Sequence, residues 1–121
     1  MDRQKIGMDA ERNAETFLKK SGLKLIIRNF RSRFGEIDLI MLDKNTLVFV
    51  EVRCRSTRNY GGAAVSVTRQ KQLRIIKTAQ WFLAQNNKYH KHDCRFDIIA
   101  FEDDAAQQKP LWYKGAFEGP G

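Results

Sequence analysis

The sequence has few cysteines and no long apolar run, and both deficits narrow the classes of protein it can encode. Its two cysteines, Cys54 and Cys94, are too few for a disulfide framework, so we expect free thiols and a reducing, cytoplasmic setting. No apolar segment is long enough to span a membrane, and residues 1–15 lack the apolar core of a signal peptide. Repeats and low-complexity blocks are also missing. These deficits favour a globular protein without a membrane anchor.

Acidic residues are outnumbered by basic ones. The chain has 22 Lys and Arg against 14 Asp and Glu, a net charge of +8 on 121 residues. Such an excess favours a polyanionic partner, most often nucleic acid, although a basic protein without such a partner has the same composition. The length and the 42% of hydrophobic residues predict one domain, 1–121, with a small core and a flexible tail at about 116–121.

Hydrophobic periodicity predicts an α/β order, αβββαβ. The expected helices span residues 3–21 and 68–86, and the expected strands span residues 23–31, 36–42, 47–54 and 94–101. The second and third strands are apolar on both faces, with Ile37 and Leu39 assigned to the same face, so both strands should be central and covered on both sides. Residues 111–117 are either a short edge strand or a wrapping segment.

Four charged residues interrupt the apolar runs of the second and third strands. Pairing these strands around a turn at residues 43–46 puts Asp38 opposite Glu51. The same register puts Glu36 opposite Arg53, and strand alternation points all four side chains to one face. Directly opposed residues have Cβ atoms about 4.5–5.5 Å apart, and like charges at that spacing are destabilising.

A bound divalent cation would explain why the two opposed acids are tolerated. Mg²⁺ and Mn²⁺ use carboxylate oxygens, commonly one or two together with water and substrate phosphate. Glu11, at the border of the apolar face of the first helix, is a candidate third carboxylate. Two simpler interpretations stay open: the strand charges are exposed, with Glu36 and Arg53 forming an ordinary ion pair, and Glu11 is a solvated helix residue.

The combination of motifs resembles the YraN family of small bacterial proteins. The resemblance covers most of the chain: Gly7, Glu11 and Ala14 on the first helix, Arg28-Asn29-Phe30-Arg31, GEIDLI at 35–40, FVEVR at 49–53 with Arg55, Gly61, Val67 to Gln72, and RFDIIAF at 95–101. That family is assigned to the PD-(D/E)xK nuclease superfamily and is similar to archaeal Holliday-junction resolvases. The resemblance therefore implies a restriction-endonuclease-like αβββαβ core, in which a mixed central sheet is flanked by helices.

The resemblance also implies a metal-dependent phosphodiesterase. The superfamily acid of the second strand matches Asp38, its D/E-x-K element matches Glu51-Val52-Arg53, and its helix carboxylate matches Glu11. Asp38, Glu51 and Arg53 are then the expected catalytic residues, with Glu11, Asp38 and Glu51 as ligands of Mg²⁺ or Mn²⁺ and Glu36 and Gln72 in supporting roles. Arg53 departs from the pattern, which has lysine at this position. Arginine holds its proton too tightly to act as a base, but it can still orient water or stabilise phosphorane charge.

A basic cluster follows the third strand and is the expected site for the phosphate backbone. Its members are Arg55, Arg58, Arg69, Lys71, Arg74 and Lys77. We expect an endonuclease acting on structured or branched DNA, with DNA favoured over RNA. The alternative is a nucleic-acid-binding protein that keeps the nuclease fold without catalysis. Because related resolvases act as dimers, a second copy of the chain is a further candidate partner.

Overall fold

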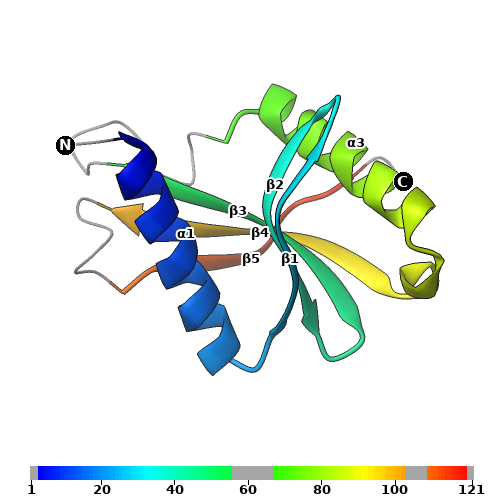
Figure 1. The fold of residues 1–121 in the computed structure, drawn as a ribbon, viewed down its shortest axis with the longest axis horizontal. Helices are drawn as coiled ribbons and strands as arrows, with labels where there is room; N and C mark the ends of the chain where they lie inside the picture. Colours follow the sequence, from blue (N-terminus) through cyan, green and yellow to red (C-terminus); the bar gives the residue numbers. More distant parts are fainter. Residues whose placement is uncertain (1–2, 56–66, 103–108, 120–121) are drawn as a thin grey trace.

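A five-stranded mixed sheet lies between two helices, one on each face (Figure 1). The computed structural model describes residues 3–55, 67–102 and 109–119. The strands follow one another across the sheet in chain order, and only β3 and β4 are parallel. The predicted α/β fold is confirmed. The elements are α1 (Arg3–Lys20), β1 (Lys24–Ser32), β2 (Gly35–Asp43), β3 (Thr46–Arg55), α3 (Arg69–Gln85), the 3₁₀ turn η1 (Asn87–Tyr89), β4 (Asp93–Glu102) and β5 (Leu111–Phe117).

Helix α1 covers one face of the sheet through a stripe of small and apolar side chains. Ala10, Ala14 and Leu18 recur at four-residue spacing, and all three are buried. They belong to a cluster with side chains of β2, β3 and β4. The helix ends where predicted, since Gly22 has a φ of +100°, a left-handed conformation that glycine adopts at little cost.

Helix α3 covers the opposite face and begins at a side-chain cap. Thr68 Oγ1 accepts a hydrogen bond from the Lys71 backbone N–H at 3.1 Å, which satisfies one of the free donors at the helix start. Ile75, Ile76 and Phe82 point into the second core cluster. Within the described residues, no helix combines the length and the apolar character needed to cross a membrane.

The β2–β3 hairpin has the predicted register. Leu42 lies opposite Leu47, and the pairing continues as far as Leu39 and Val50. The turn between the strands includes Lys44 in a left-handed conformation, with a φ of +54°. Because this register follows from a two-residue side-chain period and the length of the turn, it could be counted directly along the sequence.

Beyond Leu39, strand β2 parts from β3. The pairing of β1 with β2 continues to Ser32 and Gly35, so the two strands leave the sheet together and rise toward α3 (Figure 1). Asn29, in the middle of β1, has a φ of +52°, a conformation that asparagine tolerates better than most residues. The strands thus part next to Asp38 of β2 and Glu51 of β3.

The predicted face of Ile37 is wrong. Ile37 packs in the α3-side cluster with Ile40, whereas Leu39 packs in the α1-side cluster. A regular strand would put residues two apart on the same face. Strand β2 therefore changes face at Asp38, where it leaves β3, and no count of alternation along the sequence includes such an irregularity.

Strand β5 forms an edge of the sheet and is held by a buried acid of β4. Asp97 is fully buried and accepts hydrogen bonds from Trp112 Nε1 at 2.9 Å and from the Gly115 N–H at 3.0 Å. Of the two interpretations of residues 111–117, the edge strand is therefore confirmed. It includes residues assigned to the tail, because Phe117 is buried and stacks on Phe96 with ring centroids 5.0 Å apart.

Candidate active site

Asp38 and Glu51 lie side by side where β2 parts from β3. Asp38 Oδ2 accepts a hydrogen bond of 2.8 Å from the Val52 backbone N–H, so this carboxylate replaces a strand carbonyl as the acceptor. The two carboxyl groups also lie within hydrogen-bonding reach of each other. The fold thus brings together the two acids that the hairpin register places opposite one another.

Glu51 is the buried member of the pair, with 4% of its side chain exposed. Desolvation, followed by the charge of Asp38 and the hydrogen bond with it, raises the pKa of Glu51 to about 9. Two cations oppose this shift: Arg53 Nη1 lies 3.6 Å and Lys71 Nζ 3.8 Å from Glu51 Oε2. Burial outweighs these two cations, so the pKa of Glu51 is raised and its protonated form is favoured.

Lys71 was predicted as a phosphate contact, and the fold places its ammonium group beside the acid pair. It stands in the first turn of α3, so its ammonium group approaches Glu51 from the helix on one face of the sheet. The only signal in the sequence was its position near the apolar border of the second helix. No local sequence pattern predicts an ion pair between two residues 20 positions apart, one on a helix and one on a strand.

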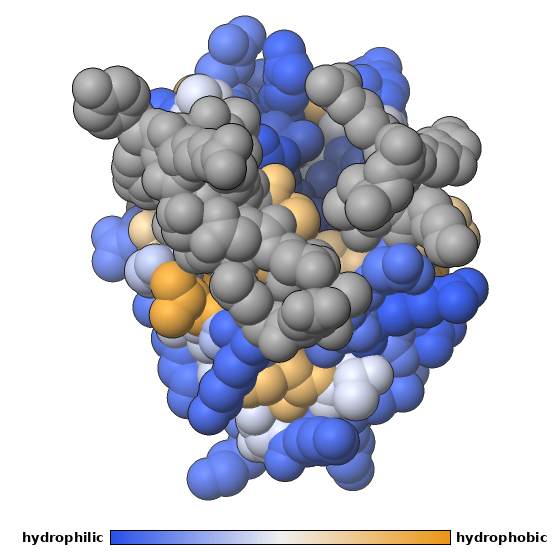
Figure 2. Space-filling model, turned by 90° about the vertical axis from the view of Figure 1, so that its left-hand side faces the viewer, coloured by the Kyte–Doolittle hydropathy of each residue, from blue (hydrophilic) through white to orange (hydrophobic). Residues whose placement is uncertain are grey.

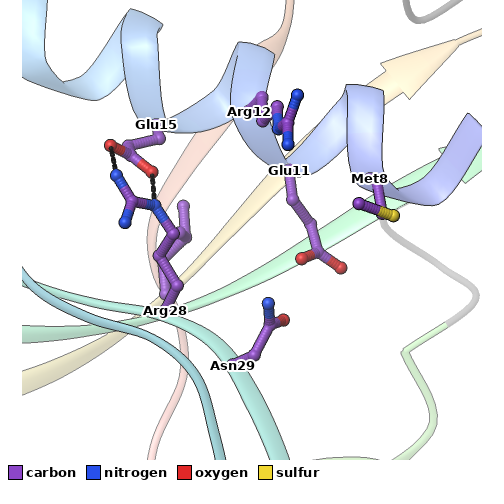
Figure 3. A pocket seen from close by; sticks show the side chains of 7 residues that line it. Met8, Glu11, Arg12, Glu15, Arg28 and Asn29 are labelled. Atoms are coloured by element: carbon purple, nitrogen blue, oxygen red, sulfur yellow. Dashed lines mark hydrogen bonds and ion pairs between the residues drawn. The ribbon is translucent and has the colours of Figure 1, made fainter. Parts of the chain in front are cut away.

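Glu11 faces the same region from α1. Desolvation, then the charges of Asp38 and Glu36, raise the pKa of Glu11 to about 7, while a hydrogen bond from Asn29 lowers it. With its nitrogen facing the acids, the Asn29 amide donates to Glu11 Oε1 at 2.9 Å and to Glu36 Oε1 at 3.1 Å. Glu11 reaches from the helix toward Asn29 on the strand (Figure 3). Glu11 is therefore an acid of the site, not an ordinary solvated helix residue.

Asn29 is a site residue that sequence reasoning did not single out. Its amide joins an acid of α1 to an acid of β2 across the parting strands. The available signal was an asparagine inside a run rich in β-forming residues, 23–31, because asparagine is depleted in regular strands. Its left-handed backbone explains why asparagine is accommodated there.

A pocket of about 130 Å³ opens between α1 and the first two strands beside Glu11 (Figure 3). Its inner wall contains the pair of Glu15 and Arg28, in which the guanidinium donates to both carboxylate oxygens, at 2.5 and 2.9 Å. Arg28 first, and then Lys19, keeps the pKa of the Glu15 carboxyl below its usual range. Glu15 is thus a structural acid whose charged form is favoured, in contrast to Glu51, whose pKa is raised. The lining residues are Met8, Glu11, Arg12, Glu15, Arg28, Asn29 and Leu39.

Glu36 does not face Arg53 as the simple register predicts. It lies opposite Arg31 of β1, and the two form an ion pair with Nε and Oε1 3.7 Å apart. Arg53 pairs with Glu51. The prediction failed because β2 has already left β3 at this point, so Glu36 meets the neighbouring strand on its other side.

The acid pair has the chemistry that Mg²⁺ or Mn²⁺ requires. Carboxylate oxygens are the ligands these ions prefer, and two carboxylates with water and phosphate are a common set. In residues 3–55, 67–102 and 109–119, no three His, Cys, Asp or Glu side chains are grouped as they would be around one ion. Asp38 and Glu51 are therefore the two carboxyl groups that the fold brings together, and Glu11 of α1 interacts electrostatically with Asp38.

The start of α3 holds two of the predicted residues in structural contacts. Arg69 Nη1 donates to Gln72 Oε1 at 2.9 Å and to the Glu118 carbonyl at 3.2 Å. Gln72 Nε2 donates to the Val67 carbonyl at 3.1 Å. These bonds fix the first turn of the helix that carries Lys71, so they support the acid pair indirectly.

The remaining basic residues of the predicted cluster are spread along α3 and the end of β3. Arg74 and Lys77 are exposed on the helix. Arg55 is the last residue of β3, but its side chain, like Arg58, lies outside the described residues. Figure 2 views the side of the molecule on which β3 and β4 end, where hydrophilic residues predominate around a recess.

The comparisons with known proteins decide the family. The model of the uncharacterised protein family UPF0102 matches residues 10–101, which include α1 from Ala10 to most of β4. The chain belongs to the UPF0102 family. A UPF0102 protein of Alcanivorax borkumensis is 50% identical over 113 residues, covering 92% of this chain and 90% of its own. One of Pseudomonas savastanoi is 46% identical over 117 residues, covering 96% and 95%.

The UPF0102 relatives include a protein that bears the YraN name. The UPF0102 protein YraN of Salmonella newport is 45% identical over 118 residues, which cover 97% of this chain and 87% of that protein. The family resemblance drawn from the motifs is therefore confirmed. The names of these UPF0102 relatives give no activity, so the function has to be argued from the site.

Proposed function

We propose that this UPF0102 protein is a metal-dependent endonuclease that acts on structured or branched DNA. The observation that carries the proposal is the buried pair of Asp38 and Glu51, two carboxyl groups in contact with Arg53 and Lys71 beside them. Such a pair costs folding free energy in the absence of a cation, because two like charges cannot both ionise at that distance. A site for a divalent ion gives the protein a reason to keep it.

Asp38 and Glu51 would hold the ion, with Glu11 available as a further carboxylate. When bound, Mg²⁺ or Mn²⁺ supplies Lewis-acid polarisation of the scissile phosphate and of the attacking water. Asn29 holds Glu11 and Glu36 together at the edge of the site through its amide. The chain itself thus supplies oxygen ligands from α1, β2 and β3, and the first turn of α3 supplies a cation.

Arg53 and Lys71 would divide the work that one lysine does in the superfamily motif. Arg53 is suited to binding the non-bridging phosphate oxygens, since its guanidinium stays charged. Lys71 faces the same Glu51 carboxyl group from α3, whereas Arg53 faces it from β3. An ammonium group, unlike a guanidinium group, can give up its proton in an active site. Together they place two positive charges where negative charge develops on the phosphate.

The charge of the chain favours DNA or RNA as the substrate. The excess of eight positive charges and the exposed Arg74 and Lys77 on α3 supply phosphate contacts that position a duplex without reading its sequence. DNA with a junction or flap is the proposed substrate, on the resemblance to junction resolvases. A homodimer is part of the same proposal, since two copies would present two acid pairs to a branched substrate.

A cleavage assay tests the proposal. Labelled four-way junction, flap, single-stranded and duplex DNA, and RNA, are incubated with the protein and Mn²⁺ or Mg²⁺, beside Asp38→Asn and Glu51→Gln. Cutting by the wild type that both variants lose supports the proposal. The matched control is Asp93→Asn, an exposed acid at the far end of the β3–β4 pairing, which should cut normally. If no substrate is cut, or if the two variants cut as well as the wild type, the protein is not this nuclease.

A binding protein without catalysis is the second candidate function. Arg53 favours it, because this residue stands where the superfamily motif has lysine and cannot accept a proton. Salt-dependent binding of the same DNA molecules, without cutting in either metal, would support this alternative.

A further inference from the structure

An exposed aromatic groove lies on α3, away from the acid pair. Trp81 is 43% exposed, and the groove beside it has a volume of about 360 Å³. An indole left in water gives up hydrophobic stabilisation, and beside a second aromatic side chain and cations it is the kind of surface that can bind a flat ligand. The described residues that line the groove include no acid; they are Phe34, Lys77, Gln80, Trp81 and Ala84.

The groove is built by two elements that are fastened to each other. Phe34 stands in the β1–β2 turn, and its backbone N–H donates to Ser32 Oγ at 3.1 Å. Ser32 Oγ in turn lies 3.1 Å from Thr78 Oγ1 of α3. Thr78 is fully buried and donates to the Arg74 carbonyl at 2.8 Å. The turn is therefore held against the helix, and Phe34 lies beside Trp81 in a preformed arrangement.

Two cations surround the Phe34 ring. Arg33 Cζ lies 5.0 Å and Lys77 Nζ 5.9 Å from the ring centroid. Both cations lie over this ring, while the neighbouring Trp81 is the exposed aromatic side chain of the groove. An exposed indole beside cations is a combination that binds an unpaired nucleotide, since the base stacks on the indole and the phosphate meets a cation. The charge of the groove thus selects an anionic ligand with a flat apolar part.

The groove can be reached from the candidate active site along α3. Lys71, Arg74, Lys77 and Trp81 recur at three- and four-residue spacing, so they share one side of α3. From Lys71 to Trp81 the helix rises about 15 Å, the length of a few nucleotides. A strand whose phosphate lies at the acid pair can therefore follow the basic residues and reach the groove.

We infer that the groove between Phe34 and Trp81 binds an unpaired nucleobase of a DNA strand that extends from the acid pair. The inference rests on the proposed function only in taking nucleic acid as the substrate. It adds a preference: a substrate with a single-stranded segment, such as a flap or an opened junction, is held better than a blunt duplex. Trp81 contributes stacking, and Arg33 and Lys77, which lie over the Phe34 ring, contribute phosphate contacts.

The test uses the full chain, a single-stranded oligothymidylate and a blunt duplex of equal length, without metal so that no cutting interferes. Stacking of a base on Trp81 should quench tryptophan emission with the single strand, and Trp81→Ala should lose the quenching. The affinity of Trp81→Ala for the single strand should fall by about tenfold, whereas its affinity for the duplex should stay the same. Thermal unfolding checks that each variant is folded.

Two further variants separate stacking from apolar bulk. Trp81→Phe keeps an aromatic plane and should retain most of the affinity, while Trp81→Leu keeps the bulk and should behave like Trp81→Ala. The matched control is Tyr113→Ala, an aromatic residue of similar exposure, 40%, on the edge strand β5, which should bind normally.

The outcomes distinguish this inference from the proposed nuclease. Cutting that depends on Asp38, together with normal single-strand affinity of Trp81→Ala, overturns the groove and leaves the nuclease. Quenching that depends on Trp81, with no cutting of any substrate, supports the groove and overturns the nuclease. A wild type that binds no oligonucleotide overturns the groove as well. A change of sedimentation in Trp81→Ala at unchanged affinity would identify the groove as an interface between copies of the chain, which also overturns the inference.

Discussion

The protonated state of Glu51 makes folding stability depend on pH in a way that can be measured. In the folded protein, burial and the charge of Asp38 raise the pKa of Glu51 from 4.5 to about 9. In the unfolded chain the same carboxyl is solvated and keeps its ordinary value. Between these two values the folded protein binds a proton that the unfolded chain has released, so stability falls as the pH rises.

The size of the effect follows from the width of that interval. One proton of difference changes the free energy of unfolding by about 1.36 kcal/mol per pH unit. From about pH 6 to about pH 8 the Glu51 carboxyl should therefore lower the free energy of unfolding by about 3 kcal/mol. The stabilisation of the protonated form is complete below the unfolded pKa of 4.5 and is lost as the pH passes through about 9.

Urea unfolding of the wild type and of Glu51→Gln at about pH 6 and about pH 8 measures this difference. The variant cannot ionise, so its free energy of unfolding should change much less over the interval, and it should exceed the wild type at the higher pH. Glu11, with a pKa raised to about 7, contributes to the pH dependence of the free energy of unfolding in both proteins. The difference between the two pH dependences is therefore due to Glu51. Addition of Mn²⁺ at the higher pH should stabilise the wild type and have little effect on Glu51→Gln.

Glu15→Gln is the matched control, because Glu15 of α1 is also a buried acid but has its pKa lowered, first by the hydrogen bond from Arg28. Its carboxyl is ionised in both states over the interval, so the variant should lose stability equally at both pH values. Equal slopes for the wild type and Glu51→Gln would mean that Glu51 is already ionised in the folded protein. The account of a proton-sharing acid pair would then be refuted.

Three further predictions concern Lys71, Asp97 and Thr68. If the proposed nuclease activity is found, Lys71→Ala should slow cutting by about 100-fold, the size typical of losing one charge that stabilises the transition state; unchanged single-turnover rates would contradict a role at Glu51. Asp97→Ala should cost about 3 kcal/mol in urea unfolding, because the partly buried Trp112 N–H and the Gly115 N–H lose their acceptor and Arg95 loses its buried partner. A loss below about 1 kcal/mol would show that β5 is held mainly by other contacts. Thr68→Ala should cost about 1 kcal/mol through loss of the α3 cap, measured the same way.

The fold was predictable because its signals are local. The four-residue spacing of Ala10, Ala14 and Leu18 predicts the helix and its buried face. The hairpin register follows from alternation and a short turn, so counting placed Asp38 and Glu51 directly beyond the observed Leu39–Val50 pair, where their carboxyl groups lie together. Counting failed one step further, at Glu36, because β2 leaves β3 beyond Leu39 and pairs only with β1.

The chain order of apolar and polar residues thus decides the α/β fold, the hairpin register and the pair of opposed acids. The burial of Glu51, its contact with Lys71 and the bridge from Asn29 to Glu11 arise only when α1 and α3 close over the two faces of the sheet. The aromatic groove of Phe34 and Trp81 has the same origin, since it needs the β1–β2 turn held against α3. Desolvation and ion pairing depend on distances between elements, and these distances are decided by packing and not by any local pattern along the chain.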